Sequence, residues 1–385
     1  MKKPGLVLLL LALLPSPGHA QEDKLITLKQ EAMHTYADMV YASYEDTYQL
    51  ATELQNAVAT FIASPSEETL QAAKDAWLAA REPYGQTEAY RFYGGPIDDA
   101  DGPEGLINAW PVDEVYIDYV EGAPEAGIIN NTADYPEIAP ELLESLNEQG
   151  AEENISVGFH AIEFLLWGQD LSADSAGQRP ATDYTTAPNA ERRAQYLLIT
   201  AELLVEHLAE LVTAWQPEVA DNYRGEFLAL EPDMALGYIL TGIGVLSKSE
   251  LAGERMFTAY DNQDQEDEHS CFSDNTHRDI ANNALGIANV YRGSYTRVDG
   301  TVISGTGLAA VVALVDTELS ETILEQLELT VQLTQELPTP FDQAIVLSES
   351  RPAVLDAIFA LQDQGDLFAE AAGTLGITIN TALPE

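Results

Sequence analysis

Cysteine and basic residues are both scarce in this sequence of 385 residues. The only cysteine is Cys271, so the chain cannot form an internal disulfide and must be stabilised by its core. Lys and Arg total 17 against 64 Asp and Glu, which gives a net charge of −47. Nucleic acid and anionic membranes are poor partners for such a surface, whereas cations are good ones. Because an acidic surface also keeps a protein soluble in salt, the charge alone does not predict a metal site.

Long apolar runs are missing after the first twenty residues. The N-terminus has a basic start at Lys2 and Lys3, an apolar stretch over 5–14, and small residues at Gly18 and Ala20. This order is typical of a secretory signal peptide over residues 1–20, and we expect cleavage after Ala20. The apolar stretch is too short to be a permanent membrane span. The sequence therefore predicts an exported protein, periplasmic or associated with the cell surface, whose mature chain has no transmembrane helix.

The alternation of apolar and polar residues that marks β-strands is nearly absent, whereas apolar residues recur at helical spacing through most of the chain. Hydrophobic residues make up 46% of the sequence, enough for a substantial core. We predict an all-α protein built from two helical bundles. The stretch 171–188 is rich in Ser, Asp, Gly, Pro and Thr, which indicates a linker or inter-domain loop. We therefore expect an N-terminal bundle over 21–175 and a C-terminal bundle over 176–385.

The segment Gly158-Phe-His-Ala-Ile-Glu-Phe places a histidine and a glutamate three residues apart in apolar surroundings. On a helix, His160 and Glu163 share one face, where an imidazole nitrogen and a carboxylate oxygen can bind a divalent metal or transfer a proton. Zinc peptidases with a His-Glu-x-x-His motif, or its inverted form, need a second histidine, and Phe164 occupies its place. A buried His–Glu pair that only orders the core would explain the same spacing.

A second group of reactive side chains lies in the segment 254–279. It combines imidazole and carboxylate groups, a mixture that suits Fe, Mn or Zn. A lone cysteine is more often a small buried hydrophobe than a ligand, and we expect this of Cys271. The candidate metal ligands in the segment are Asp264, Glu266, Asp267 and His269, and the other candidates are Arg255, Asp274 and His277.

Residues 77–92 form a third candidate region, in which aromatic and charged residues recur at steps of three and four. Glu88 and Arg91 are three residues apart, and because arginine is scarce we expect Arg91 to be paired and partly buried. The irregular region that follows adds Asp113 and Tyr116. A surface stripe of ion pairs is the plainer interpretation of these residues.

The three regions together resemble the imelysin family. Gly158, His160 and Glu163 match its Gly-x-His-x-x-Glu signature. The block over 254–276 is similar to the second block of its iron-regulated branch, and the stretch 77–92 is similar to the first. The resemblance spans nearly the whole mature chain. It implies two helical bundles related by a duplication, with a crevice between them lined by the signature residues, and export with expression tied to iron limitation.

The resemblance also frames the expected function. The family is grouped with metallopeptidases and includes a periplasmic component of ferrous-iron uptake. We therefore expect the protein to bind a divalent metal, iron in preference to zinc, for iron acquisition together with a membrane component. His160 and Glu163 would be ligands from one bundle, and one or more of Asp264, Glu266, Asp267 and His269 would add ligands from the other. Glu88 and Arg91 would orient these ligands.

Two other functions stay open at the level of the sequence. In a metallopeptidase, Glu163 would serve as the general base for a metal-bound water, or as a ligand, while His160 and His269 hold the ion. In a non-catalytic module, the crevice would bind a peptide, haem or a partner protein. The missing second histidine of a zinc peptidase leaves the question of enzymatic activity open.

Overall fold

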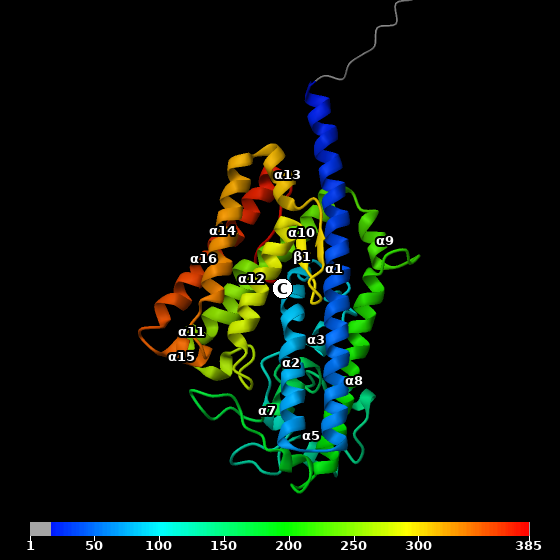
Figure 1. Ribbon diagram of the computed structural model, residues 1–385, viewed down its shortest axis with the longest axis vertical. Helices are drawn as coiled ribbons and strands as arrows, with labels where there is room; N and C mark the ends of the chain where they lie inside the picture. The colour runs from blue at the N-terminus through cyan, green and yellow to red at the C-terminus, as the bar shows by residue number, and fades with distance from the viewer. Residues whose placement is uncertain (1–16, 385) are drawn as a thin grey trace, which may run out of the picture.

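The computed structural model describes residues 17–384 of the chain (Figure 1). Its α-helices are α1 (Pro17–Ala63), α2 (Glu67–Thr87), α3 (Glu104–Ile107), α4 (Glu114–Ile117), α5 (Gly127–Asn130), α6 (Pro140–Leu146), α7 (Gly158–Trp167), α8 (Ala190–Trp215), α9 (Tyr223–Leu228), α10 (Pro232–Val245), α11 (Thr258–Asn262), α12 (Thr276–Arg292), α13 (Leu308–Val315), α14 (Thr317–Gln335), α15 (Phe341–Val346) and α16 (Arg351–Thr374). The 3₁₀ helices are η1 (Glu88–Tyr90), η2 (Ala181–Tyr184) and η4 (Gln265–Asp267), and η3 (Leu246–Phe257) is a π-helix. The predicted all-α class is confirmed.

The first helical group consists of α1, α2, α7 and α8. The long helices α1, α2 and α8 lie side by side, and α7 packs against α2 and α8 (Figure 1). Ser66 begins α2 with a capping box: its hydroxyl accepts a hydrogen bond from the Thr69 N–H at 3.2 Å, and its own N–H donates to the Thr69 hydroxyl at 3.1 Å. Such a cap satisfies amide groups that have no partner inside the helix. The buried face of α2 carries Trp77, Arg81 and Tyr84, so this helix points a cation as well as aromatic rings inward.

The second helical group is built around α12. This helix packs against α14, η3 and α13, while α16 packs against η3, α14 and α10. The helix α12 also packs along α2, so the two groups share a continuous interface (Figure 1). A buried apolar cluster extends through both groups. The interface between α2 and α12 is therefore the place where side chains from the two parts of the chain can meet.

The division into bundles over 21–175 and 176–385 stays a prediction. The helix α8 follows that division but packs against α1 and α7, and α1 also contacts α10 and α13. The predicted linker 171–188 contains η2, and its Arg179, Asp183 and Tyr184 are buried. This stretch is thus part of the packed structure, because it contributes buried side chains.

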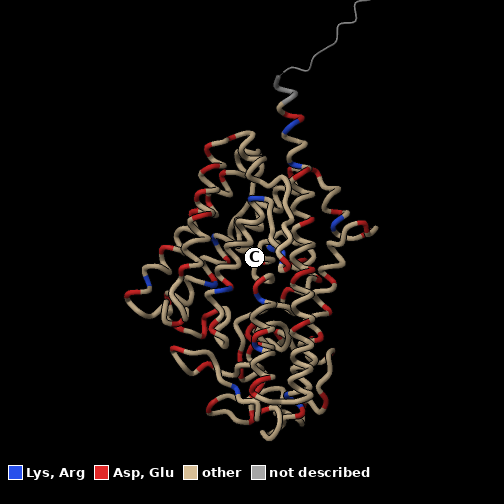
Figure 2. The backbone as a smooth tube through the Cα atoms, in the orientation of Figure 1, with Lys and Arg blue, Asp and Glu red and all other residues tan. Residues whose placement is uncertain are grey.

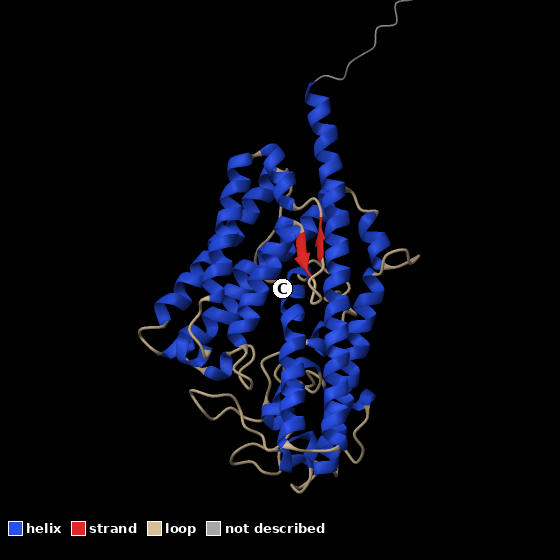
Figure 3. Ribbon diagram, viewed as in Figure 1, coloured by secondary structure: helices blue, strands red, loops and turns tan. Residues whose placement is uncertain are grey.

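The departures from the helical pattern are small. The strands β1 (Ser294–Thr296) and β2 (Val302–Ser304) form an antiparallel hairpin that the sequence did not predict (Figure 3). The region after residue 93, predicted to be irregular, contains three single-turn helices, α3, α4 and α5. Single turns are short enough that hydrophobic periodicity does not reveal them.

The predicted signal peptide lies outside the described residues except for 17–20, where α1 begins. Within residues 17–384, no helix combines the length and the apolar character that a membrane crossing requires. Acidic side chains are distributed over both helical groups, and basic ones are few (Figure 2). The fold therefore places its few arginines against many carboxylates, and several of these pairs are buried.

Candidate functional site

Two histidines from distant parts of the chain meet in the interior. His160 lies on α7, and His269 lies in the segment that leads into α12. Their ring centroids are 4.7 Å apart with an angle of 72° between the planes. His160 is 1% exposed and His269 is 2% exposed. The two imidazoles, with Glu163, Asp279 and Arg81, form what we call the histidine site.

His160 and Glu163 form the pair that their spacing predicts. The Nδ1 atom of His160 lies 2.8 Å from Oε2 of Glu163. The other carboxyl oxygen, Oε1, accepts hydrogen bonds from the N–H and the hydroxyl of Ser273, at 2.9 and 2.7 Å. Burial raises the pKa of Glu163 to about 8 in spite of these bonds. Burial also holds the pKa of His160 well below its usual value, so the pair carries no net charge at neutral pH.

His269 is oriented by a carboxylate. Its Nδ1 atom lies 2.8 Å from Oδ2 of Asp279, and Arg81 approaches Oδ1 of the same carboxylate at 3.0 Å. Burial disfavours the charge on Asp279, but Arg81 and His269 outweigh it and hold its pKa well below the usual range. Burial, together with the nearby Arg255, lowers the pKa of His269 to about 4. The neutral ring therefore donates from Nδ1 to Asp279, which directs Nε2 away from that carboxylate.

A buried network of charges joins the histidine site to the π-helix η3. Glu88 is 1% exposed and accepts hydrogen bonds from Arg255 at 2.6 Å and from Arg91 at 2.7 Å. Burial raises the pKa of Glu88, but the two guanidinium groups outweigh burial and lower it to about 2. The Asn108 amide donates to Glu88 at 3.3 Å and also contacts Arg81. Since π-helices often mark functional positions, the network and η3 belong to the same candidate site.

The donor atoms of the histidine site suit a transition metal, although they are not yet arranged around one. The Nε2 atom of His160 is buried and has no hydrogen-bond partner. The Nε2 atom of His269 has only a long contact of 3.5 Å to Asn108. Among residues 17–384, the metal-ligating side chains whose ligand atoms all lie within 4.8 Å of one another are instead Asp170, Asp274 and Asp342. The donor atoms of the histidine site therefore do not surround a common metal position in this arrangement of the side chains.

The predicted candidates divide into two sets. His160, Glu163 and His269 meet at the histidine site, and Glu88, Arg91 and Arg255 form the adjoining network. The remaining candidates make local contacts elsewhere. Within the described part of the chain, none of them forms a hydrogen bond with His160 or His269. These are Asp264, Glu266, Asp267, Asp113, Tyr116, Asp274 and His277.

The three acidic residues at 264–267 lie on and beside the short helix η4. Asp264 is exposed and caps η4 by accepting from the Glu266 N–H at 3.1 Å. Asp267 accepts from Asn262 at 2.7 Å. Burial and the nearby carboxylate of Glu114 raise the pKa of Glu266 to about 7. These side chains lie at the protein surface, because the chain turns at Gln263, which has a left-handed φ of 54°.

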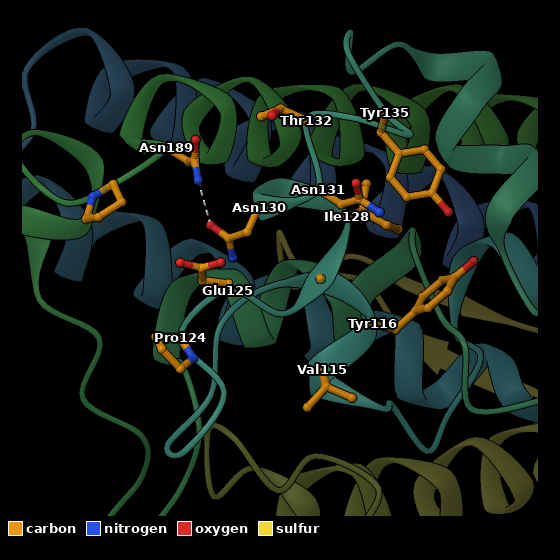
Figure 4. Close-up of a pocket in the computed structure, with 12 residues that line it drawn as sticks. Val115, Tyr116, Pro124, Glu125, Ile128, Asn130, Asn131, Thr132, Tyr135 and Asn189 are labelled. Carbon is orange, nitrogen blue, oxygen red and sulfur yellow. Dashed lines mark hydrogen bonds between the residues drawn. The ribbon is translucent and has the colours of Figure 1, made fainter.

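Tyr116 lines a different cavity. Its hydroxyl donates to the Leu146 carbonyl at 2.8 Å, and its ring lies at the edge of a cavity of about 780 Å³ (Figure 4). On the other side of this cavity, the Asn189 amide donates to Asn130 at 2.8 Å. Asp113 caps the short helix α4 by accepting from the Val115 N–H. Neither Asp113 nor Tyr116 contributes an atom to the histidine site.

Four residues that contact the histidine site or its network were not among the predicted site residues: Arg81, Asn108, Ser273 and Asp279. Only Asn108 lies outside the segments 77–92 and 254–279 that the sequence indicated. Arg81 and Asp279 are 198 residues apart, and no spacing rule relates such positions. The scarcity of arginine was a signal for Arg81, because an arginine on a buried face of a helix requires an acidic partner. A partner on a distant helix emerges only from the fold.

Comparisons with known proteins agree with this architecture. The sequence model of the imelysin family matches residues 40–368. The iron-regulated protein A of Synechococcus elongatus is 28% identical over 356 residues, which covers 90% of this chain and 86% of that protein.

Two solved structures share the fold. A crystal structure described as an iron-regulated protein A precursor from Parabacteroides distasonis has a TM-score of 0.71 at 22% identity, and covers 91% of this chain and 95% of its own. An imelysin-like protein from Psychrobacter arcticum has a TM-score of 0.61 at 13% identity, and covers 96% of this chain and 100% of its own. At these identities the structures support the fold alone. The family match extends over most of the sequence, and the chain belongs to the imelysin family.

Proposed function

We propose that this protein binds a divalent transition metal, iron in the first place, at the histidine site and serves iron acquisition. The observation that carries the proposal is the buried Nε2 atom of His160, which has no partner and lies beside the ring of His269. Two imidazoles and one carboxyl group are donors that suit iron, manganese or zinc. The similarity to a protein named iron-regulated protein A supports an iron-related function.

The protonation of the His160–Glu163 pair explains how the site would accept a cation. With Glu163 protonated, its hydroxyl donates to Nδ1 of His160, and the neutral ring carries its proton on Nε2. When that proton moves from Glu163 to Nδ1 and the proton on Nε2 leaves to the solvent, Nδ1–H donates to the carboxylate and the lone pair of Nε2 becomes available for a metal. Asp279 already holds His269 in the corresponding tautomer. Metal binding would therefore release about one proton.

Burial favours an ion as the ligand over a polypeptide. His160 and Glu163 are 1% and 0% exposed, so a peptide bond cannot reach them without a large opening between α7 and the segment that precedes α12. A metal ion is far smaller than a polypeptide. The metallopeptidase alternative, with Glu163 as general base, would require that larger opening. A haem or peptide module would require the same opening.

The sequence supports a place for this function. The predicted signal peptide and the absence of a membrane-crossing helix among the described residues fit an exported protein that works in the periplasm or at the cell surface. We propose that the bound ion is cargo, which the protein delivers to a membrane component of an iron-uptake system. The acidic surface would attract cations to the protein.

Titration calorimetry with Fe(II), under anaerobic conditions, tests the proposal. We expect stoichiometric binding to the untagged chain and a loss of affinity of at least about tenfold in His160→Ala. His34→Ala is the matched control, because His34 is exposed on α1 and far from the site along the chain. Equal Fe(II) affinity in the two variants would exclude His160 as a ligand.

The peptidase alternative needs a separate measurement. We expect no cleavage of a denatured protein substrate by the iron-loaded chain. Cleavage that stops both with a chelator and in Glu163→Gln would replace iron delivery with metal-assisted hydrolysis as the function of the histidine site.

A further inference from the structure

Three aspartates from distant segments converge beside the histidine site without being part of it. Asp170 follows α7, Asp274 precedes α12, and Asp342 lies in the first turn of α15. One carboxylate oxygen of each lies within 4.8 Å of the others. Asp170 and Asp342 are each 5% exposed, and Asp274 is partly buried. We call these three residues the aspartate cluster.

The aspartate cluster has no basic partner. Among residues 17–384, none of its three carboxylates forms an ion pair with lysine or arginine. The Oδ1 atom of Asp170 accepts from the Ser172 N–H at 2.9 Å, and that of Asp342 accepts from the Gln343 N–H at 2.8 Å. The Oδ2 atom of Asp342 is buried and has no hydrogen-bond partner among the described residues. A buried carboxylate oxygen without a partner is costly unless a ligand satisfies it.

A fourth carboxyl group adds to the same imbalance. Glu268 is 3% exposed, and its Oε1 atom is buried without a hydrogen-bond partner. Burial raises its pKa well above the usual value, and the charges of the three aspartates raise it further. Burial likewise raises the pKa of Asp274 to about 7 and that of Asp170 to about 6, with repulsion from Asp342 in both cases. The chain thus gathers acidic groups and supplies nothing positive to neutralise them.

We propose that the aspartate cluster is a binding site for a hard divalent cation of the size of calcium. Its donors are carboxylate oxygens only, without imidazole or thiolate, which is the preference of Ca²⁺ and Mg²⁺ and differs from that of the histidine site. Two of the three ligands come from irregular segments, which suit the flexible geometry of Ca²⁺ better than the rigid octahedron of Mg²⁺. Glu268 lies close enough to assist or to stay protonated beside the ion.

A cation there would tie together three parts of the fold. The 171–188 stretch already contacts α15 through Gln343, whose amide donates to the Ala173 carbonyl at 3.0 Å. Ser273, which donates two hydrogen bonds to Glu163, directly precedes Asp274. The ion would therefore fix the backbone that supplies Ser273 to the histidine site. Its role is to brace the site, and the proposed iron cargo binds elsewhere.

Calcium titration of the untagged full chain, after treatment with EDTA, tests this inference. We expect one saturable Ca²⁺ per chain with a dissociation constant on the order of 0.1–1 mM, and an unfolding midpoint that rises with Ca²⁺. Asp274→Asn and Asp342→Asn should each weaken binding at least about tenfold. Asparagine tolerates the left-handed φ of 56° at position 274, so the first variant keeps the backbone.

Asp363→Asn is the matched control, because it removes the same charge from an exposed position of α16. If this variant binds Ca²⁺ as weakly as Asp274→Asn, the ion is attracted only by the general surface charge and the inference fails. It also fails if the wild type shows no saturable binding of Ca²⁺ or Mg²⁺, because protons then neutralise the cluster. A His160→Ala/Glu163→Ala variant should change its Ca²⁺ affinity by only a few-fold, much less than the loss in Asp274→Asn, which separates this outcome from that of the iron titration.

Discussion

The histidine site and the aspartate cluster are neighbouring buried polar regions that neutralise their charges in opposite ways. At the histidine site, Asp279 faces Arg81, and in the adjoining network Glu88 faces Arg91 and Arg255. In the aspartate cluster, the described chain offers no cation. The charged groups of the first region are paired within the protein, whereas those of the second need protons or an ion from the solvent.

This difference has consequences for stability. Removing one partner of a complete buried pair leaves a charge uncompensated, so substitutions at the histidine site should destabilise the fold. Removing one charge from a group of like charges relieves repulsion, so substitutions in the aspartate cluster should be neutral or stabilising when no ion is bound. The sign of the change in the free energy of unfolding therefore distinguishes the two kinds of region.

The largest effect is expected for Arg81→Met. Arg81 and Asp279 are both 1% exposed at the side chain, and they connect α2 to α12. The substitution leaves Asp279 buried without its cation, which should lower the free energy of unfolding by about 3–5 kcal/mol. Urea unfolding followed by far-ultraviolet circular dichroism measures this change.

The same two helices offer a matched control. Arg278 and Glu82 also connect α12 to α2, but their side chains are 41% and 42% exposed. Arg278→Met should cost no more than about 1 kcal/mol, since exposed ion pairs contribute little. Equal losses in Arg81→Met and Arg278→Met would show that burial of the first pair has no energetic weight.

Glu88→Gln should remove a pH dependence from the stability. The pKa of Glu88 is about 2 in the folded protein, below the reference value of 4.5. A lowered pKa stabilises the fold above pH 4.5, and this contribution, about 3 kcal/mol, is lost as the pH falls towards 2. The difference in unfolding free energy between wild type and Glu88→Gln should therefore shrink between pH 5 and 2.5.

Glu68→Gln provides the comparison for the acid range, because Glu68 is exposed at the start of α2 and forms no ion pair in the described structure. A difference between wild type and Glu88→Gln that stays constant with pH would contradict the ionised state of Glu88.

Local patterns predicted local features well. The recurrence of apolar residues at helical spacing and the His160–Glu163 pair both depend on residues within one or two turns of each other. The position of His269 beside His160 was also expected, but from the family resemblance and not from any spacing. Helical geometry is sufficient to explain these local features.

Apart from the position of His269 beside His160, the sequence did not predict which distant segments come together. The acidic residues 264–267 adjoin His269 in the chain, yet they lie on the surface because the backbone turns at Gln263 and His269 enters the core only after η4. The aspartate cluster joins three segments, and one of its members, Asp170, borders the stretch predicted to be a linker. Neither turn geometry nor helix packing can be read from composition. The sequence could therefore suggest which side chains can bind a metal, but not which of them lie together in the fold.

Asp342→Asn should have the opposite sign to Arg81→Met when EDTA is present. The substitution removes one of the repelling charges and replaces the unpartnered Oδ2 atom with an amide NH₂ group, which can donate a hydrogen bond. We expect a gain of up to about 1 kcal/mol in the free energy of unfolding, measured by urea titration at pH 7.5. Ca²⁺ should then stabilise the wild type and not the variant. A loss of stability in EDTA as large as that of Arg81→Met would mean that Asp342 has an essential structural contact.

The smallest effect tests whether the two regions are coupled. Glu163 and Asp274 are connected through Ser273, whose N–H and hydroxyl bind Glu163. A double-mutant cycle of Glu163→Gln and Asp274→Asn should give an interaction energy of about 0.5 kcal/mol or more in Ca²⁺, because neighbouring residues in one network are not additive. In EDTA the same cycle should approach additivity, since no ion then holds the Asp274 carboxylate in place. Additivity in both conditions would mean that the histidine site keeps its geometry without help from the aspartate cluster.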